Sequence, residues 1–191
     1  MNPKIIKIYL VTGNRHKLEE ARQALAGFPV SVAQLKEEKY EPKEMSLEEV
    51  SAYNAELFFK KYRRPICVDD TGIFFKAYPN FPGSHPRLIY EMLGYKGIFK
   101  VISGEVRDAF FKTAVGYCDE KGVKIFSGIL KCRADIRVND PDKDVLPYER
   151  IMLIDGKALS SYSREEKGRI SHRSIAFRKL GEYLRGALPK K

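Results

Sequence analysis

The order of the apolar segments constrains this fold more than any other feature, because their pattern changes half-way along the chain. The first half alternates β-rich apolar runs with stretches of helical periodicity. Two longer β-rich segments, 109–117 and 123–132, then flank a turn sequence at 119–122, which predicts a β-hairpin. A helical pattern over 171–188 follows. The order predicts an α/β fold with a mixed sheet.

Local signals place the remaining elements. Strands are predicted at 5–11, 30–35, 66–68 and 151–154, and helices at 16–25, 87–93 and 98–102. Ser46 and Glu49 form a capping-box pattern that opens a further helix, which should end before Pro65. The strand at 66–68 is expected to stop at the turn-like sequence 69–72.

Length and hydropathy limit how the chain is organised. Its 191 residues suit one large domain or two closely joined lobes. We expect a single two-lobed domain over residues 1–191, with a section at about 107–155 forming much of the second lobe and a cleft between the lobes. No apolar run approaches the roughly 20 residues that span a bilayer, and residues 1–7 are too polar for a signal peptide. We therefore expect a cytoplasmic protein with no membrane partner.

The balance of charge favours anionic ligands. The chain has 35 Lys and Arg against 25 Asp and Glu, a net charge of +10. These basic residues are scattered, so they fit a phosphate-rich small ligand at least as well as a stripe for nucleic acid, and nucleic acid is not the partner we expect.

The segment 12–17, Thr-Gly-Asn-Arg-His-Lys, joins the first predicted strand to the first predicted helix. Such a junction presents free backbone N–H groups at the positive end of a helix, where phosphates bind. Thr12 and Asn14 add polar groups, and Lys17 adds a charge that can reach a phosphate. The spacing of a Walker loop is absent, and a structural turn with a solvated lysine is the alternative.

Two adjacent carboxylates, Asp69 and Asp70, follow the buried run 66–68. Neighbouring negative charges are costly to hold unless a cation offsets them. Mg²⁺ needs few protein carboxylates and completes its octahedron with water and substrate phosphate. Either aspartate could also deprotonate an attacking water. An Asp-rich turn cap is the alternative.

The tripeptide Ser171-His172-Arg173 lies at the start of the last predicted helix. A serine N-cap explains Ser171 by itself. Cations are unfavourable at the positive end of a helix, so His172, Arg173 and the nearby Lys167 indicate a bound anion.

A loop with two prolines and a glycine, Phe-Pro-Gly-Ser-His-Pro-Arg at 81–87, should be rigid. Arg87 at its end could reach a phosphate, and a purely structural loop is equally compatible.

In their order along nearly the whole chain, these segments resemble the inosine triphosphate pyrophosphatase family. The matching residues are Thr12, Asn14, Lys17, Glu20, Glu41, Asp69, Asp70, Thr71, Gly72, Phe81, Pro82, Gly83, Arg87, Glu166, Lys167, Ser171, His172 and Arg173. Glu41 best matches a family glutamate between the second strand and the next helix, with Glu37 and Glu38 as other choices.

The chain departs from that family in the loop that recognises the base. Residues 146–152 read Leu-Pro-Tyr-Glu-Arg-Ile-Met. Tyr148 matches an aromatic position, Leu146 replaces the Phe that stacks on the purine, and Glu149 replaces an Asp. Base stacking is worth about 1–3 kcal/mol, so its loss could weaken base binding by about tenfold or more.

The resemblance implies Mg²⁺-dependent hydrolysis of non-canonical purine nucleoside triphosphates, such as ITP, dITP and XTP, to monophosphate and pyrophosphate. It implies a homodimer whose long curved mixed sheet carries two α/β lobes around a central cleft. Asp70 and Lys17 would be catalytic, and Glu41, Asp69 and Asp70 would contact the metal. The implied substrate contacts are Thr12, Asn14, Arg87, Tyr148, Glu149, Lys167, His172 and Arg173.

Two other functions stay open. The altered base loop could select a different modified nucleotide for the same chemistry. A non-catalytic protein that binds nucleotides or RNA could use the same scaffold, although a binding protein has no need of paired acids.

Overall fold

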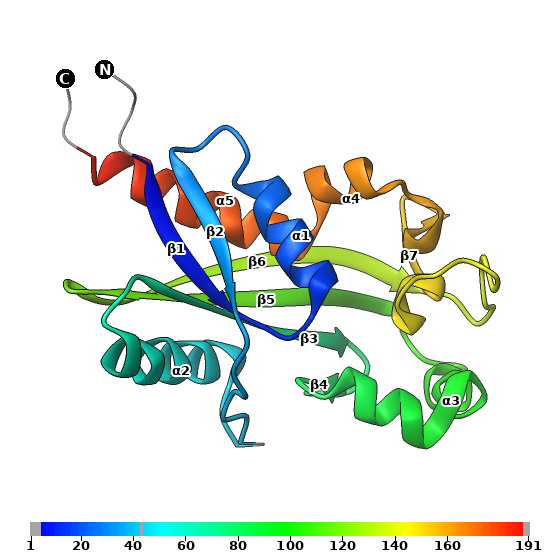
Figure 1. Cartoon of the computed structure of the whole chain (residues 1–191). Helices are drawn as coiled ribbons and strands as arrows, with labels where there is room; N and C mark the ends of the chain where they lie inside the picture. The colour runs from blue at the N-terminus through cyan, green and yellow to red at the C-terminus, as the bar shows by residue number, and fades with distance from the viewer. Residues whose placement is uncertain (1–4, 43, 189–191) are drawn as a thin grey trace.

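The computed structural model describes residues 5–42 and 44–188, in which eight strands form one mixed sheet (Figure 1). The strands are β1 (Ile6–Val11), β2 (Val30–Leu35), β3 (Ile66–Phe75), β4 (Pro82–Gly83), β5 (Asp108–Asp119), β6 (Gly122–Ala134), β7 (Met152–Ile154) and β8 (Lys157–Ala158). Their order in the sheet is β2-β1-β3-β5-β6-β7-β8, with β4 paired to β3. β1 is parallel to both β2 and β3, and the other pairs are antiparallel. The predicted α/β class with a mixed sheet is confirmed.

The helices cover both faces of this sheet (Figure 1). They are α1 (Arg15–Ala24), α2 (Leu47–Tyr62), α3 (Pro86–Ile102), α4 (Arg164–Ile170) and α5 (His172–Gly186), with short 3-10 turns η1 (Pro147–Arg150) and η2 (Leu159–Ser161). α1 and α5 pack on one face of the sheet, and α2 packs on the other. Ile98 of α3 packs in a cluster with Phe111, whose ring stacks on His172 of α5, so α3 covers the α5 face near the open end of the hairpin. None of the helices in the described ranges is long and apolar enough to cross a membrane.

Alternation along the strands divides the core into layers. Leu10 and Cys67 pack with α1 and α5, whereas their neighbours Val11 and Val68 pack with α2. This follows from the two-residue period of a strand, which sends successive side chains to opposite faces. A third apolar cluster, which includes Ile98 of α3, lies toward the other end of the long hairpin. The division into two lobes stays a prediction.

Local sequence signals set several of the boundaries. The capping box is present at the start of α2, where Glu49 N donates to Ser46 Oγ at 3.2 Å and Ser46 N donates to Glu49 Oε2 at 2.8 Å. α2 ends before Pro65, as predicted, because Arg63 adopts the left-handed conformation at φ 52°. Gly94 breaks α3 at φ 56°, which accounts for the two separate helical patterns in the sequence.

The prediction that the third strand stops at Asp69 is wrong. β3 continues to Phe75, and its partner β5 pairs with it over the whole length, with Asp69 opposite Val115 and Asp70 opposite Ala114. The hydroxyls of Thr71 and Thr113 also bond across this ladder at 2.8 Å. Pairing with a long neighbouring strand therefore overrides the local turn preference, and the acidic pair lies within the sheet.

The helix α4 was not predicted. Its capping box, in which Glu166 N donates to Ser163 Oγ at 3.1 Å, is readable in the sequence Ser-Arg-Glu-Glu at 163–166. The helix is only seven residues long, so it shows little periodicity.

Candidate active site

Asp69 anchors a buried cluster of charges on the α1 and α5 side of the sheet. Only 1% of this residue is exposed. Its Oδ2 lies 3.2 Å from Lys17 Nζ of α1 and accepts from Arg173 Nε of α5 at 3.0 Å. Arg173 also donates to Glu20 Oε1 at 2.9 Å and to Thr71 Oγ1 at 3.1 Å. The cluster therefore joins a strand and two helices that are distant in sequence.

The charged states of this cluster follow from burial and pairing. Burial alone would raise the pKa of Asp69, but Lys17, Arg173 and Lys39 outweigh it and hold that pKa well below its usual range. Burial opposes the charge of Arg173, yet Glu20 and Asp69 raise its pKa further. Burial lowers the pKa of Lys17 despite the attraction of Asp69. Asp69 is therefore an ion-pair partner here, and the metal contact expected for it stays a prediction.

Asp70 lies beside a second cation, Lys39. Because consecutive strand residues face opposite sides, the side chain of Asp70 points away from that of Asp69. Lys39 Nζ lies 3.6 Å from Asp70 Oδ1 and 2.6 Å from Glu41 Oε1, and it donates to the backbone oxygen of Asp69 at 3.1 Å. Burial raises the pKa of Asp70, and Lys39 opposes that rise. Glu41 and Asp70 thus share one ammonium group.

Of the three glutamates that could match the family's metal-contacting glutamate, Glu41 is the one whose side chain shares Lys39 with Asp70. Glu37 instead pairs with Lys61 at 2.9 Å and accepts from the Tyr62 hydroxyl. Glu38 is exposed. This geometry favours the register choice that the motif suggested.

The start of α1 is built as an anion site. Asn14 caps the helix, accepting from His16 N at 2.9 Å and Lys17 N at 3.3 Å, while Thr12 Oγ1 accepts from Asn14 N at 3.0 Å. The first turn carries Arg15, His16 and Lys17 and no acidic residue. Arg15 pairs with Glu19 at 2.8 Å and Lys17 with Asp69, and the N–H groups of this first turn could receive an anion at the positive helix end.

The start of α5 lies close to the same cluster. Ser171 caps this helix, accepting from Ser174 N at 3.1 Å. His172 is buried and stacks on Phe111 with ring centroids 5.0 Å apart. Burial, then Arg173, lowers the pKa of His172 well below its usual value. His172 Nδ1 has no hydrogen-bond partner within the described residues, so it is a buried polar atom available to a ligand.

A cavity of about 550 Å³ adjoins the cluster. Its walls come from α1, from the segment 143–149 and from the segment 160–167. Lys167 Nζ and Glu149 Oε2 pair at 2.6 Å on its wall, and the half-exposed Leu146 also lines it. Glu20 lines the cavity and binds Arg173, so the cavity and the Asp69 cluster share a wall. A ligand in the cavity could extend to the basic start of α1.

Two of the predicted substrate residues lie elsewhere. Arg87 is on the exposed face of α3, where its Nε pairs with Glu91 at 2.7 Å. Tyr148 is buried within the apolar cluster that contains Ile98, and its hydroxyl has no partner among the described residues. The structure brings neither of them into contact with the Asp69 cluster.

Residues 8–183 match the model of the Ham1 family. The chain belongs to the Ham1 family. It is 36% identical over 184 residues to a dITP/XTP pyrophosphatase of Saccharolobus solfataricus, covering 94% of each chain. It is 34% identical over 183 residues to a dITP/XTP pyrophosphatase of Methanosarcina mazei, covering 94% of this chain and 98% of the relative. The family match confirms the resemblance drawn from the motifs.

Solved structures support the Ham1 fold. A HAM1 protein from Coxiella burnetii superposes with a TM-score of 0.79 at 18% identity, over 96% of this chain and 100% of that one. The Staphylococcus aureus Ham1 protein superposes with a TM-score of 0.75 at 19% identity, over 95% and 100% of the chains.

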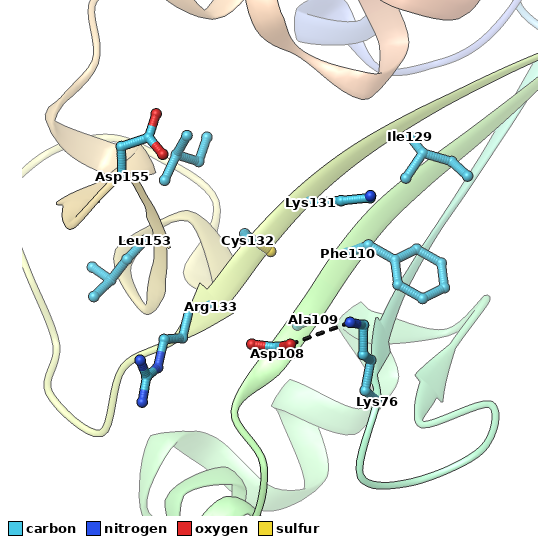
Figure 2. Close-up of a pocket in the computed structure, with 11 residues that line it drawn as sticks. Lys76, Asp108, Ala109, Phe110, Ile129, Lys131, Cys132, Arg133, Leu153 and Asp155 are labelled. Atoms are coloured by element: carbon cyan, nitrogen blue, oxygen red, sulfur yellow. Dashed lines mark hydrogen bonds and ion pairs between the residues drawn. The ribbon is translucent and has the colours of Figure 1, made fainter.

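A second cavity, of about 570 Å³, lies at the far end of the hairpin (Figure 2). Lys76 and Asp108 pair at 3.2 Å in it, and Lys131, Arg133 and Asp155 also line it (Figure 2). None of the predicted site residues lines this cavity. Its Lys76–Asp108 ion pair is exposed, whereas the ion pairs of Asp69 are buried, so we do not assign this cavity to the active site.

The residues around Asp70 fit a magnesium ion. Within residues 5–42 and 44–188 no three His, Cys, Asp or Glu side chains form a ready metal cage. Mg²⁺ does not require one, because it commonly uses one or two carboxylates and completes its shell with water and substrate phosphates. Glu41 and Asp70 already hold a positive charge between them, that of Lys39. The donor chemistry therefore suits the ion.

Lys39 is the main site residue that the sequence motifs did not identify. It lies two residues before Glu41 in a segment without regular structure. In an extended chain, residues two apart face the same way. The spacing of Lys39 and Glu41 could therefore have predicted that the two side chains lie together. Its position depends on folding of that segment against β3.

Proposed function

We propose that this protein hydrolyses non-canonical purine nucleoside triphosphates of the dITP, ITP and XTP type to the monophosphate and pyrophosphate. One observation carries the proposal: Lys17 and Arg173 pair with the buried Asp69, Lys39 lies beside the adjacent residue Asp70, and Glu20 joins the Asp69 cluster to a cavity of about 550 Å³. The names of its Ham1 relatives, dITP/XTP pyrophosphatases at 34–36% identity, support the same substrate class.

Each residue of the cluster has a task in this reaction. Asp70, whose pKa burial raises, positions the attacking water and accepts its proton. Lys17 stabilises charge that develops on the phosphates. Asp69 holds Lys17 and Arg173 in place through buried ion pairs. Bound Mg²⁺, held by Glu41 and Asp70, would supply further neutralisation of the phosphate charge.

The remaining contacts divide between phosphate and base. Thr12 and Asn14 shape the loop that presents the start of α1 to the phosphates. Glu149 and Lys167 line the cavity and offer an acceptor and a donor to the edge of a base. His172 Nδ1 offers one further buried polar atom near the cluster. In this proposal Tyr148 holds the base loop in place by packing in the apolar cluster with Ile98. Arg87 reaches a phosphate only if its segment moves.

Two features favour this proposal over its alternatives. A protein that only bound nucleotides or RNA would have no use for a buried Asp70 beside Glu41 and Lys39. The named relatives are dITP/XTP pyrophosphatases, which favours a purine substrate over a different modified nucleotide. Because the base loop at 146–152 departs from the family pattern, the identity of the substrate base is the more important alternative to test.

A panel of triphosphates tests the proposal. With Mg²⁺ present, pyrophosphate release is measured with ITP, dITP and XTP, and with ATP and modified pyrimidine triphosphates as competitors. We expect kcat/KM for the three purine substrates to exceed that for ATP by about tenfold or more. Preference for a modified pyrimidine would establish that the substrate is a different modified nucleotide. Salt-sensitive RNA binding without turnover of any triphosphate would establish a non-catalytic binding protein.

We also propose a cytoplasmic homodimer. The exposed Leu88 and Met92 lie one helical turn apart on α3 and offer an apolar surface for a second copy. The mass of the purified protein in solution, measured by light scattering, distinguishes a dimer from a monomer.

A further inference from the structure

Lys39 lies where the proposed function needs a divalent cation. Its ammonium is 2.6 Å from Glu41 Oε1 and 3.6 Å from Asp70 Oδ1, so one positive charge already bridges the two carboxylates. The side chain is 14% exposed. An ion that used both carboxylates would need the space that this ammonium fills.

The backbone beside Lys39 is anchored firmly. Asn54 of α2 is fully buried and makes two hydrogen bonds with the backbone of Tyr40. Tyr40 N donates to Asn54 Oδ1 at 2.8 Å, and Asn54 Nδ2 donates to Tyr40 O at 2.7 Å. Lys39 and Glu41 flank this anchored residue, so both start from fixed positions next to Asp70.

The side chain of Lys39 can nevertheless move. Among the described residues, its polar contacts are made by the terminal ammonium, with two carboxylates and one backbone oxygen. A lysine has a flexible four-carbon stem, so the ammonium can leave this position while the anchored backbone stays in place. A nearby phosphate would offer the displaced ammonium a new anionic partner.

We propose that Lys39 occupies the cation position between Glu41 and Asp70 in the nucleotide-free protein, so that Mg²⁺ binds there only together with nucleotide phosphates, which receive the displaced ammonium. This inference rests on the proposed function for the identity of the metal and the substrate. A metal arriving alone must break the contacts of Lys39 without replacing them. A metal arriving with a triphosphate meets no such penalty, which couples the two binding events.

Metal binding without nucleotide tests the proposal directly. Mn²⁺, as a stand-in for Mg²⁺, is titrated into the whole protein while the electron paramagnetic resonance signal of the free ion is followed. Lys39→Met removes the competing charge and keeps a side chain of similar length. Lys60→Met is the matched control, because Lys60 loses an equivalent pair with Glu56, at 2.7 Å, on the exposed face of α2. Lys39→Gln serves if circular dichroism shows that Lys39→Met does not fold.

We expect Lys39→Met to bind Mn²⁺ about tenfold or more tightly than the wild type, because a like charge no longer competes for the carboxylates. Lys60→Met should bind as the wild type does. Adding Asp70→Asn to Lys39→Met should remove the gain. Wild-type affinity in Lys39→Met, or a gain that persists with Asp70→Asn, would overturn the proposal. Failure of pyrophosphate release would instead refute the proposed function, and the Mn²⁺ measurement is independent of it.

Discussion

Arg173 shows how a single side chain can organise this site. Its three guanidinium nitrogens donate to Asp69 and Thr71 of β3 and to Glu20 of α1. A planar guanidinium suits such a role, since its donors point in fixed directions, and lysine could not replace it. Removing one partner from a buried pair typically costs about 3–5 kcal/mol. The geometry of the phosphate site therefore depends on a residue that the motif alone presents as a substrate contact.

His172 predicts a specific pH dependence of stability. Its pKa in the folded protein lies well below the usual value of about 6.5, through burial and then the charge of Arg173. Below about pH 6.5 the unfolded chain binds a proton at this residue and the folded chain does not, so stability falls as the pH falls. The imidazole makes no Nδ1 hydrogen bond within the described residues and stacks on Phe111, so His172→Phe should fold.

We expect urea unfolding at pH 7.5 and pH 5.5 to reveal this effect. The stability of His172→Phe relative to the wild type should improve toward the lower pH, by up to about 1.4 kcal/mol per pH unit. Parallel stability curves for the two proteins would show that the pKa of His172 is the same in the folded and unfolded chain, contrary to the lowering that its burial causes.

At the scale of elements, two helices approach the long hairpin closely because glycines face them. A Cβ at Gly128 of β6 would lie 2.1 Å from the carbonyl oxygen of His172, and a Cβ at Gly116 of β5 would lie 2.2 Å from that of Ser51. Both contacts are with helix backbone, which cannot rotate aside. These glycines thus set the distance of α5 and α2 from the sheet.

Gly128→Ala should displace the start of α5, which carries His172 and Arg173. We expect a loss of about 1–3 kcal/mol in the free energy of unfolding, together with reduced turnover. Gly186→Ala is the control, because a Cβ there meets nothing within 4 Å and the change should alter stability by less than about 1 kcal/mol. Urea unfolding and pyrophosphate release measure both effects. Equal stability of the two variants would contradict the close packing of α5.

The sequence predicted the elements whose signals are local and missed those that depend on partners. The capping box of α2 and the hairpin of β5 and β6 were readable because neighbouring residues determine them. The continuation of β3 through Asp69 and Asp70 was not, because it requires β5 alongside. Lys39 was missed for the same reason, since its contacts join an irregular segment to β3.

At the scale of the whole molecule, the fold gathers motifs from both ends of the chain at one place. Thr12 and Lys17 follow β1, Asp69 and Asp70 lie in β3, and Arg173 opens α5. The motif order predicted that these residues act together, and the ion pairs of Asp69 bring three of the segments into contact. The positions of Arg87 and Tyr148 could not be predicted from motifs, because they depend on how α3 and η1 pack. The net charge of +10 agrees with an anionic substrate.

The most direct test of this account is the rate of pyrophosphate release from XTP with Mg²⁺, compared between the wild type, Asp70→Asn and the control Asp108→Asn. Asp108 pairs with Lys76 on the exposed surface at the far end of the hairpin, so its variant should retain wild-type turnover. The wild type should form one pyrophosphate for each monophosphate, and Asp70→Asn should slow this by about 100-fold or more. Undiminished turnover in Asp70→Asn, or release of inorganic phosphate in place of pyrophosphate, would contradict the assignment.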